Sequence, residues 1–108
     1  MTWENAKMWC EEMGRNSHLV KIKTKEENDF LVGNFSGYNS WIGGNDIDKE
    51  GSFRWTDGSP LIFTGWGQDE PNNSGGGEDC AHMYILKNNM WNDARCTAKF
   101  FFICERED

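Results

Sequence analysis

One acidic, glycine-rich segment, residues 70–79, carries most of the side chains that are able to bind a hard cation. Calcium takes roughly six to eight oxygen ligands from carboxylates, amide carbonyls and the backbone. Glu70 and Asn72 stand two positions apart, so their oxygens project to the same side of an extended segment. The glycines that follow let the chain fold back, so that Glu78 can reach the same ion. Taken alone, the segment also fits a solvated surface loop without metal.

A second acidic pattern lies upstream. Residues 46–57 hold acids at the first, third and fifth positions and glycine at the sixth, which nearly matches an EF-hand loop. We reject an EF-hand because neither flank, residues 41–44 or residues 57–60, has the pattern of an amphipathic helix. An acidic turn without metal stays open as the alternative to a calcium site of another kind.

Length and composition bound the class of protein. We expect residues 1–108 to form one domain with a single core. The net charge of −7 argues against nucleic acid or an anionic membrane as partner, and no stretch is apolar enough to span a bilayer.

Without a CxxC pair, a zinc site is poorly supported. An even number of cysteines favours two disulfides and a secreted protein or an ectodomain, and three pairings are open for Cys10, Cys80, Cys96 and Cys104.

Two helices and several short strands are predicted to position these residues. The first helix begins after Thr2 as N-cap and stops at Gly14, with apolar residues at helical spacing. Residues 18–22 are predicted to form a strand. The second helix runs from the capping box of Thr24 and Glu27 to about Val32. The apolar positions of the first helix are Trp3, Ala6, Trp9, Cys10 and Met13, and the buried face of the second is Phe30 and Leu31.

The middle of the chain, residues 34–77, is predicted as long irregular chain with apolar islands that anchor it to the core. Trp66 is expected to be one such anchor. A loop this long needs something else to hold it, and bound metal is one candidate. Three short strands are predicted after it, at residues 83–86, 90–91 and 100–104, and His82 is expected to be structural.

Several motifs, taken in order from Thr2 to Glu105, resemble the C-type lectin family. They are Trp41-Ile42-Gly43-Gly44, Arg54-Trp55-Thr56-Asp57-Gly58-Ser59-Pro60, Glu70-Pro71-Asn72, Gly77-Glu78-Asp79-Cys80, and Trp91-Asn92-Asp93 followed by two cysteines. The resemblance implies an α+β fold with two helices, two small antiparallel sheets and a long calcium-binding loop. It also implies the disulfides Cys10–Cys104 and Cys80–Cys96. The first strand of the family, which precedes the first helix, is expected to be absent.

The resemblance further implies one or two calcium sites. The primary site, which would also hold the sugar, consists of Glu70, Asn72, Glu78, Asn92 and Asp93. The auxiliary site consists of Asp46, Glu50, Asn73, Glu78 and Asp79.

The function that the resemblance implies is calcium-dependent sugar binding without catalysis. In the family, Glu-Pro-Asn accompanies mannose, N-acetylglucosamine and fucose, whereas Gln-Pro-Asp accompanies galactose. Glycans, including those on microbial surfaces, are the expected partners, with a role in innate immunity and with oligomerisation for avidity. A galactose-type lectin and a lectin-like protein-binding module are the alternatives, and a metal-dependent hydrolase is disfavoured because no general base stands out.

Two Asn-x-Ser sequons are present, at Asn34 and Asn72. Asn34 could carry a glycan. Asn72 is expected to be unmodified, because modification would remove a predicted metal ligand.

Overall fold

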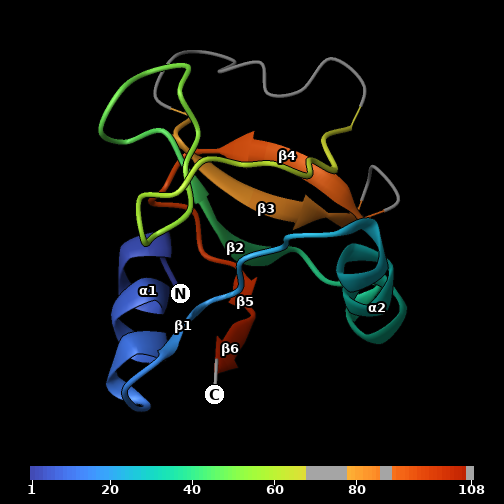
Figure 1. Cartoon of the computed structure of the whole chain (residues 1–108), viewed down its shortest axis with the longest axis horizontal. Coiled ribbons are helices and arrows are strands. Elements are labelled where there is room, and N and C mark those ends of the chain that lie inside the picture. Colours follow the sequence, from blue (N-terminus) through green and yellow to red (C-terminus); the bar gives the residue numbers. More distant parts are fainter. Residues whose placement is uncertain (68–77, 86–88, 107–108) are drawn as a thin grey trace.

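The computed structural model describes residues 1–67, 78–85 and 89–106. Two helices lie on opposite sides of a central sheet (Figure 1). This α+β arrangement confirms the predicted fold class. The elements in chain order are α1 (Trp3–Glu12), β1 (Ser17–Leu19), α2 (Lys25–Phe35), β2 (Ser40–Asn45), β3 (Cys80–Tyr84), β4 (Met90–Ala94), β5 (Phe101–Phe102) and β6 (Cys104–Arg106).

Two sheets are present, as predicted. The larger has the strand order β4-β3-β2-β5, and the smaller pairs β1 with β6. One detail of the prediction was wrong, because β2 and β5 run parallel, with Ser40 beside Phe101. The chain crosses over after β4 and joins the far edge of β2, so the larger sheet is mixed. The prediction of irregular chain from residue 34 was also wrong for β2, which is a central strand.

Both helices begin at the predicted caps. The Oγ1 atom of Thr2 accepts a hydrogen bond from the Asn5 amide, and that of Thr24 accepts one from the Glu27 amide. Such caps satisfy backbone amides that have no partner within the helix. The second helix continues beyond the predicted end and stops at Phe35, before the extended residue Ser36.

The predicted buried faces of the helices were only partly right. On α1, Trp3, Ala6 and Cys10 are buried, whereas Trp9 and Met13 face solvent. On α2, Leu31 is buried but Phe30 is 67% exposed. Successive helical residues point about 100° apart, so a helix that packs along a narrow stripe cannot bury both neighbours. An apolar side of α2 therefore remains uncovered.

Side chains on the two faces of the larger sheet belong to two separate cores. Trp41 of β2 packs with Trp3 and Cys80, and the next residue, Ile42, packs with Met83 and Trp91. This alternation follows from the two-residue period of a strand. The core of Ile42 also receives Trp66, whose ring stacks edge-on against Trp91 at 5.6 Å. Trp66 is thus the predicted anchor of the long loop.

The predicted disulfides are present. Cys10–Cys104 ties α1 to β6, and Cys80–Cys96 ties the start of β3 to the segment after β4. In the chain-entropy account, closing these two loops contributes about 4 to 5 and about 3 kcal/mol. The second bond fixes the sheet beside the predicted metal ligands.

His82 is structural, as predicted. Its side chain is 1% exposed and stacks on Phe100, with ring centroids 4.5 Å apart. Burial disfavours the charged ring and lowers the pKa of His82 to about 4, and the nearby Asn92 backbone and Asp93 carboxylate oppose this shift only in part. The fold therefore favours neutral His82.

We predict that His82→Phe makes the fold less sensitive to acid. An unfolded histidine takes up a proton near pH 6.5, so a native pKa near 4 costs the wild type up to about 3 kcal/mol as the pH falls from 6.5 to 4. Urea unfolding in chelator at pH 7 and pH 4.5 measures this loss. Comparing the two proteins removes the contribution of all other titrating groups. Equal pH dependence in wild type and variant would contradict the assignment.

Candidate metal and sugar site

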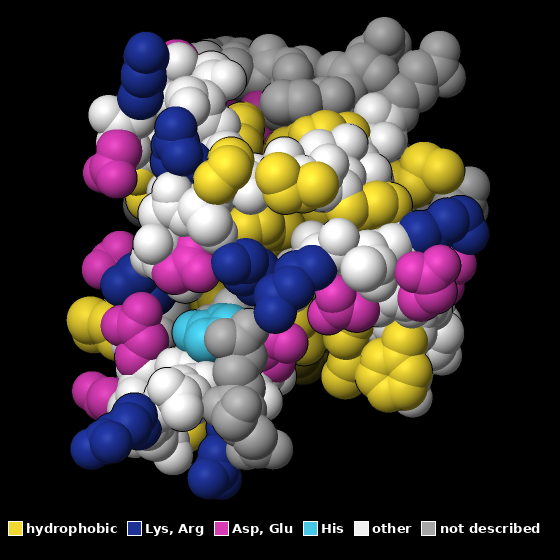
Figure 2. Space-filling model, viewed as in Figure 1, with side chains coloured by type: hydrophobic (Ala, Val, Ile, Leu, Met, Phe, Trp, Pro, Cys, Tyr) yellow, Lys and Arg dark blue, Asp and Glu magenta, His cyan; other side chains and the backbone are white. Residues whose placement is uncertain are grey.

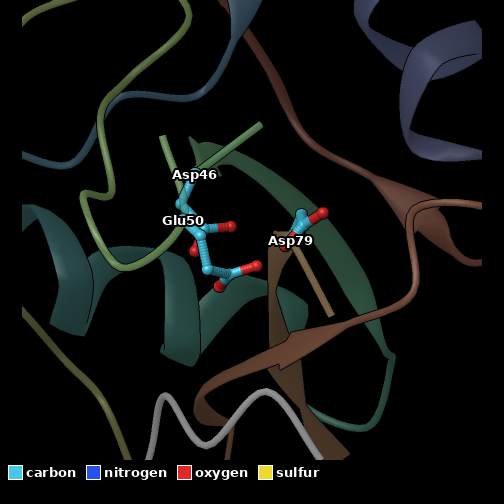
Figure 3. Close-up of side chains that lie close together, drawn as sticks. All are labelled: Asp46, Glu50 and Asp79. Atoms are coloured by element: carbon cyan, nitrogen blue, oxygen red, sulfur yellow. The ribbon is translucent and has the colours of Figure 1, made fainter. Parts of the chain in front are cut away.

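Three carboxylates converge where the long loop leaves and re-enters the sheet. They belong to Asp46, which directly follows β2, to Glu50 in the next turn, and to Asp79, which directly precedes β3. One oxygen from each lies within 4.8 Å of the others, and Figure 3 shows the three side chains pointing toward one another. Ligand oxygens of a calcium ion have such a spacing.

The β2–β3 ladder is what brings two of these acids together. Asn45 pairs with Cys80, and the Asp46 amide donates to the Asp79 carbonyl at 2.9 Å, so the antiparallel register continues one pair beyond the strands. Asp46 and Asp79 therefore stand directly opposite each other. Like charges in that position are destabilising unless a cation lies between them.

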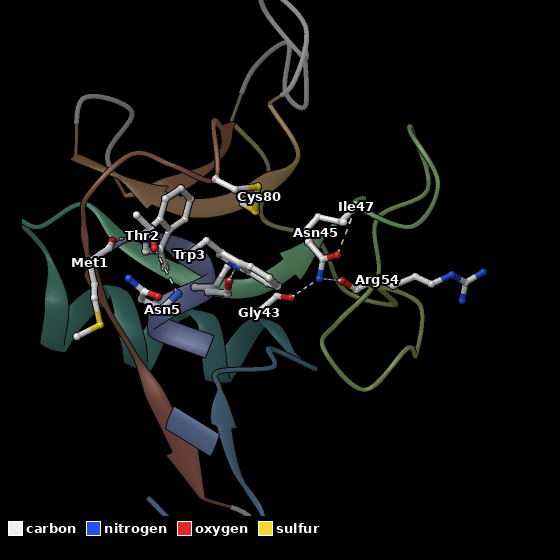
Figure 4. The surroundings of a disulfide bond; sticks show 12 residues. Met1, Thr2, Trp3, Asn5, Gly43, Asn45, Ile47, Arg54 and Cys80 are labelled. Atoms are coloured by element: carbon white, nitrogen blue, oxygen red, sulfur yellow. Dashed lines mark hydrogen bonds between the residues drawn. A yellow bond between two sulfur atoms is a disulfide. The ribbon is translucent and has the colours of Figure 1, made fainter. Parts of the chain in front are cut away.

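The turn after β2 is held by Asn45 (Figure 4). Its Oδ1 accepts a hydrogen bond from the Ile47 amide at 3.3 Å, and its Nδ2 donates to the Gly43 carbonyl at 3.2 Å. The first bond spans Asp46, and the second holds the Asn45 side chain against the end of β2. The Gly51 amide then donates to Oδ2 of Asp46 at 2.8 Å, so one carboxylate oxygen is fixed by the backbone.

Two other carboxylate oxygens of this cluster could be satisfied by a cation. Oδ1 of Asp46 and Oδ1 of Asp79 are buried and accept no hydrogen bond within the described part of the chain. Burial, opposed by the Gly51 amide and assisted by the carboxyls of Glu50 and Asp79, raises the pKa of Asp46 to about 7. Buried carboxylates normally have charge partners or metal. This donor set therefore fits a hard cation.

Three of the five residues predicted for the auxiliary site are thus brought together. Glu78 is next to Asp79 in sequence and is half-buried. Asn73 lies outside the described residues, so its place in the site stays a prediction.

Part of the predicted primary site lies within the described residues. Asn92 and Asp93 lie on β4, beside β3, with Asp93 paired to Ala81 and only 1% exposed. Nδ2 of Asn92 donates to the Asp93 carbonyl at 2.9 Å, so the side chain of one predicted ligand residue lies against the backbone of the next. Glu70 and Asn72 lie outside the described residues.

Trp91 is held by two parts of the chain that no sequence pattern indicated, and the first is the segment of Gly65 and Gly67. The Trp91 amide donates to the Gly65 carbonyl at 2.8 Å, and the Gly67 amide donates to the Trp91 carbonyl at 2.9 Å. A Cβ on Gly65 would lie 2.9 Å from the indole nitrogen of Trp91, so a larger residue there would displace the ring or the loop. Gly65 belongs to none of the motifs identified in the sequence, so nothing in the sequence signals this role.

The second missed contact comes from α2. The indole nitrogen of Trp91 donates to Oδ1 of Asn28 at 2.9 Å. A buried indole N–H needs an acceptor, and Asn28 supplies it from a distant part of the chain. This bond orients the residue directly before Asn92. Only the folded structure shows it, because asparagine inside a helix usually faces solvent.

Comparisons with known proteins agree on one family. The model of the family described as Lectin C-type domain matches residues 1–106. A lectin of Pleurodeles waltl is 40% identical over 109 residues, which cover 96% of this chain and 63% of that protein. The hepatic lectin of Gallus gallus is 39% identical, over 98% of this chain and 50% of that protein. The chain thus spans about half to less than two thirds of the length of these relatives.

Solved structures give the same result. The carbohydrate-recognition domain of the mouse scavenger receptor C-type lectin has a TM-score of 0.88 at 37% identity, covering 99% of this chain and 83% of that one. The cow C-type carbohydrate-recognition domain of CD23, solved in the presence of a GlcNAc2Man3 oligosaccharide, has a TM-score of 0.88 at 35% identity, covering 100% of this chain and 82% of that one. These domains bind carbohydrate and are not enzymes. The chain belongs to the C-type lectin domain family.

Proposed function

We propose that this domain binds mannose-type sugars, namely mannose, N-acetylglucosamine and fucose, through vicinal hydroxyls on a bound calcium ion. The observation that supports it best is the set of converging carboxylates of Asp46, Glu50 and Asp79, with two buried oxygens that accept no hydrogen bond from any described residue. They lie at the point where the segment with Glu-Pro-Asn rejoins the sheet.

The described frame supports a primary site built from Glu70, Asn72, Glu78, Asn92 and Asp93. Gly67 is hydrogen-bonded to Trp91, and Asn92 follows Trp91 in β4. Glu70 is three residues beyond Gly67, and three residues span at most about 10 Å. The chain between Gly67 and Glu70 is therefore short enough to be compatible with a shared ion.

The residue types of this site suit a sugar diol. When bound, calcium would supply positive charge and coordination places for two hydroxyl oxygens. The carboxylates of Glu70 and Glu78 can accept the hydroxyl hydrogens, and the amide of Asn72 can donate to the same oxygens. The geometry of these donors and acceptors would decide which diol fits. We infer mannose-type preference from Glu-Pro-Asn, in keeping with the mannose-containing oligosaccharide present with the cow CD23 domain.

The biological setting is part of the proposal. Two disulfides favour an oxidising compartment, so we infer a secreted protein or an ectodomain that meets glycans, including microbial ones in innate immunity. Among the described residues, no helix has the length and apolar character needed to cross a membrane. One shallow sugar site gives a dissociation constant near 1 mM, about −4 kcal/mol, so useful avidity requires clustering of several domains.

We predict that the domain is retained on mannose or N-acetylglucosamine resin in calcium and released by chelator. Glu78→Gln should abolish retention, because it removes one charge from the proposed site. Asp48→Asn is the matched control, since it removes an exposed acid that belongs to neither proposed site, and it should be retained. Elution from the resin measures the outcome.

Three results would contradict this proposal, and two of them would indicate a different function. Retention that survives chelator would argue against calcium dependence. Preference for galactose resin in the wild type would indicate a galactose-type lectin. Absence of binding to any sugar resin, with calcium bound and the fold intact, would favour a protein-binding module.

We predict that calcium reverses the contribution of Asp46 to the pH dependence of stability. Without metal, the raised pKa of Asp46 means that the fold favours the neutral acid, so this residue's contribution to stability should fall as the pH rises from about 4 to about 7, opposite in sign to that of His82. With calcium at about a hundredfold above its dissociation constant, stability at pH 7 should rise by about 2.7 kcal/mol. Thermal unfolding of wild type and Asp46→Asn, with calcium or chelator, measures both effects. A calcium gain in Asp46→Asn equal to that of the wild type would exclude Asp46 as a ligand.

We predict that acid releases the sugar. Carboxylates must be ionised to hold calcium, so calcium affinity should fall steeply as the pH drops from 7 to 4. Calorimetric titration with calcium at several pH values measures this directly, and resin elution at the same values tests whether sugar release follows. Calcium affinity that stays flat across the range would contradict carboxylate ligation.

A further inference from the structure

The uncovered side of α2 carries two exposed aromatic residues. Phe30 is 67% exposed and Phe35 is 38% exposed. Both line a hollow of about 530 Å³ together with Val20, Leu31 and Ile103. Figure 2 shows hydrophobic side chains at the surface on the side of the molecule where α2 lies. Exposed apolar surface of this kind calls for a covering group.

Asn34 is placed to supply that group. It is exposed, it lies four residues after Phe30, and its Nδ2 donates to the Phe30 carbonyl at 2.7 Å. Residues four apart lie on the same face of a helix, so the amide of Asn34 is directed along the helix toward the turn of Phe30.

The sequence around Asn34 is an acceptor for N-linked sugar. Asn34-Phe35-Ser36 is an Asn-x-Ser sequon. It straddles the end of α2, because Phe35 is the last helical residue and Ser36 is extended, with φ −60° and ψ 146°. All three residues are exposed. The two disulfides favour folding in the oxidising secretory compartment, where such glycans are added.

We propose that Asn34 carries an N-linked glycan and that its first sugars lie over Phe30. The donor class is an oligosaccharide joined to a lipid through pyrophosphate. The anomeric carbon forms a bond to Nδ2 of Asn34, the bond from that carbon to the pyrophosphate oxygen breaks, and one amide proton leaves. One amide hydrogen remains on Nδ2, so the bond to the Phe30 carbonyl can persist.

The surroundings of Phe30 favour a neutral sugar as the covering group. Glu26, Glu27 and Glu105 also line the hollow, and their charges would repel an acidic partner but not an uncharged saccharide. The C–H face of a pyranose ring can bury apolar area against an aromatic ring while its hydroxyls stay in water. A glycan at Asn34 thus covers the apolar side of α2 without a second protein.

Occupancy is tested on the protein secreted from eukaryotic cells. Peptide mass spectrometry should find a glycan on Asn34 in the wild type. Ser36→Ala should lose it, because the sequon is destroyed while Asn34 is kept, and Ser36→Thr should retain it. Wild-type protein secreted in folded form with Asn34 unmodified would overturn the proposal. Asn34→Gln serves as a second unglycosylated reference.

The position of the glycan is tested by hydroxyl-radical labelling. Labelling of Phe30 should be about twofold lower in glycosylated wild type than in Ser36→Ala, because a sugar on one ring face blocks about half of the exposed ring. Phe101 on β5, which is 64% exposed, is the matched control and should be labelled equally in both proteins. Equal labelling of Phe30 in the two proteins would overturn its coverage by the glycan. Neither measurement depends on calcium or on sugar binding by the domain.

Discussion

The backbone hydrogen bond from Asp46 to Asp79 is the interaction on which the candidate site depends. It extends the β2–β3 ladder by one pair, and that extra pair places two acids face to face in a buried position. A sheet alone would gain nothing from this arrangement, because it costs repulsion and desolvation. A cation between the two carboxylates would offset both costs.

A disulfide, aromatic packing and a hydrogen bond hold the strands around this backbone bond in place. The disulfide between Cys80 and Cys96 holds the start of β3, and aromatic packing around Trp91 holds β4. Trp3 adds a hydrogen bond from its indole nitrogen to the Ile42 carbonyl at 2.9 Å, which ties α1 to β2. The strands beside the candidate ligands are therefore fixed by contacts with the rest of the fold.

Sequence patterns predicted the helix caps and the fold class, and both are confirmed; Asp46, Glu50 and Asp79 do lie together, while their role as metal ligands stays a prediction. They succeeded where the signal is local, as at Thr2 and Thr24, or where several motifs occur in order. They failed where pairing between distant segments determines the structure. The parallel β2–β5 pair is the example, because nothing within a strand shows which strand lies beside it. The prediction that Phe30 is buried was wrong. Helical spacing shows which residues share a face of the helix, but it does not show how much of that face the rest of the molecule covers. The Asn28–Trp91 bond joins residues 63 positions apart and has no local signature.

The two ends of the long loop are fastened independently of what lies between them. Gly67 is bonded to β4 on one side, and Asp79 is bonded to the residue after β2 on the other. Both attachment points therefore belong to the sheet, which is held by its own strand pairing and by a disulfide. Substitutions between the two points can change ligand preference while these contacts stay the same. Recognition can diversify in this way on an unchanged framework.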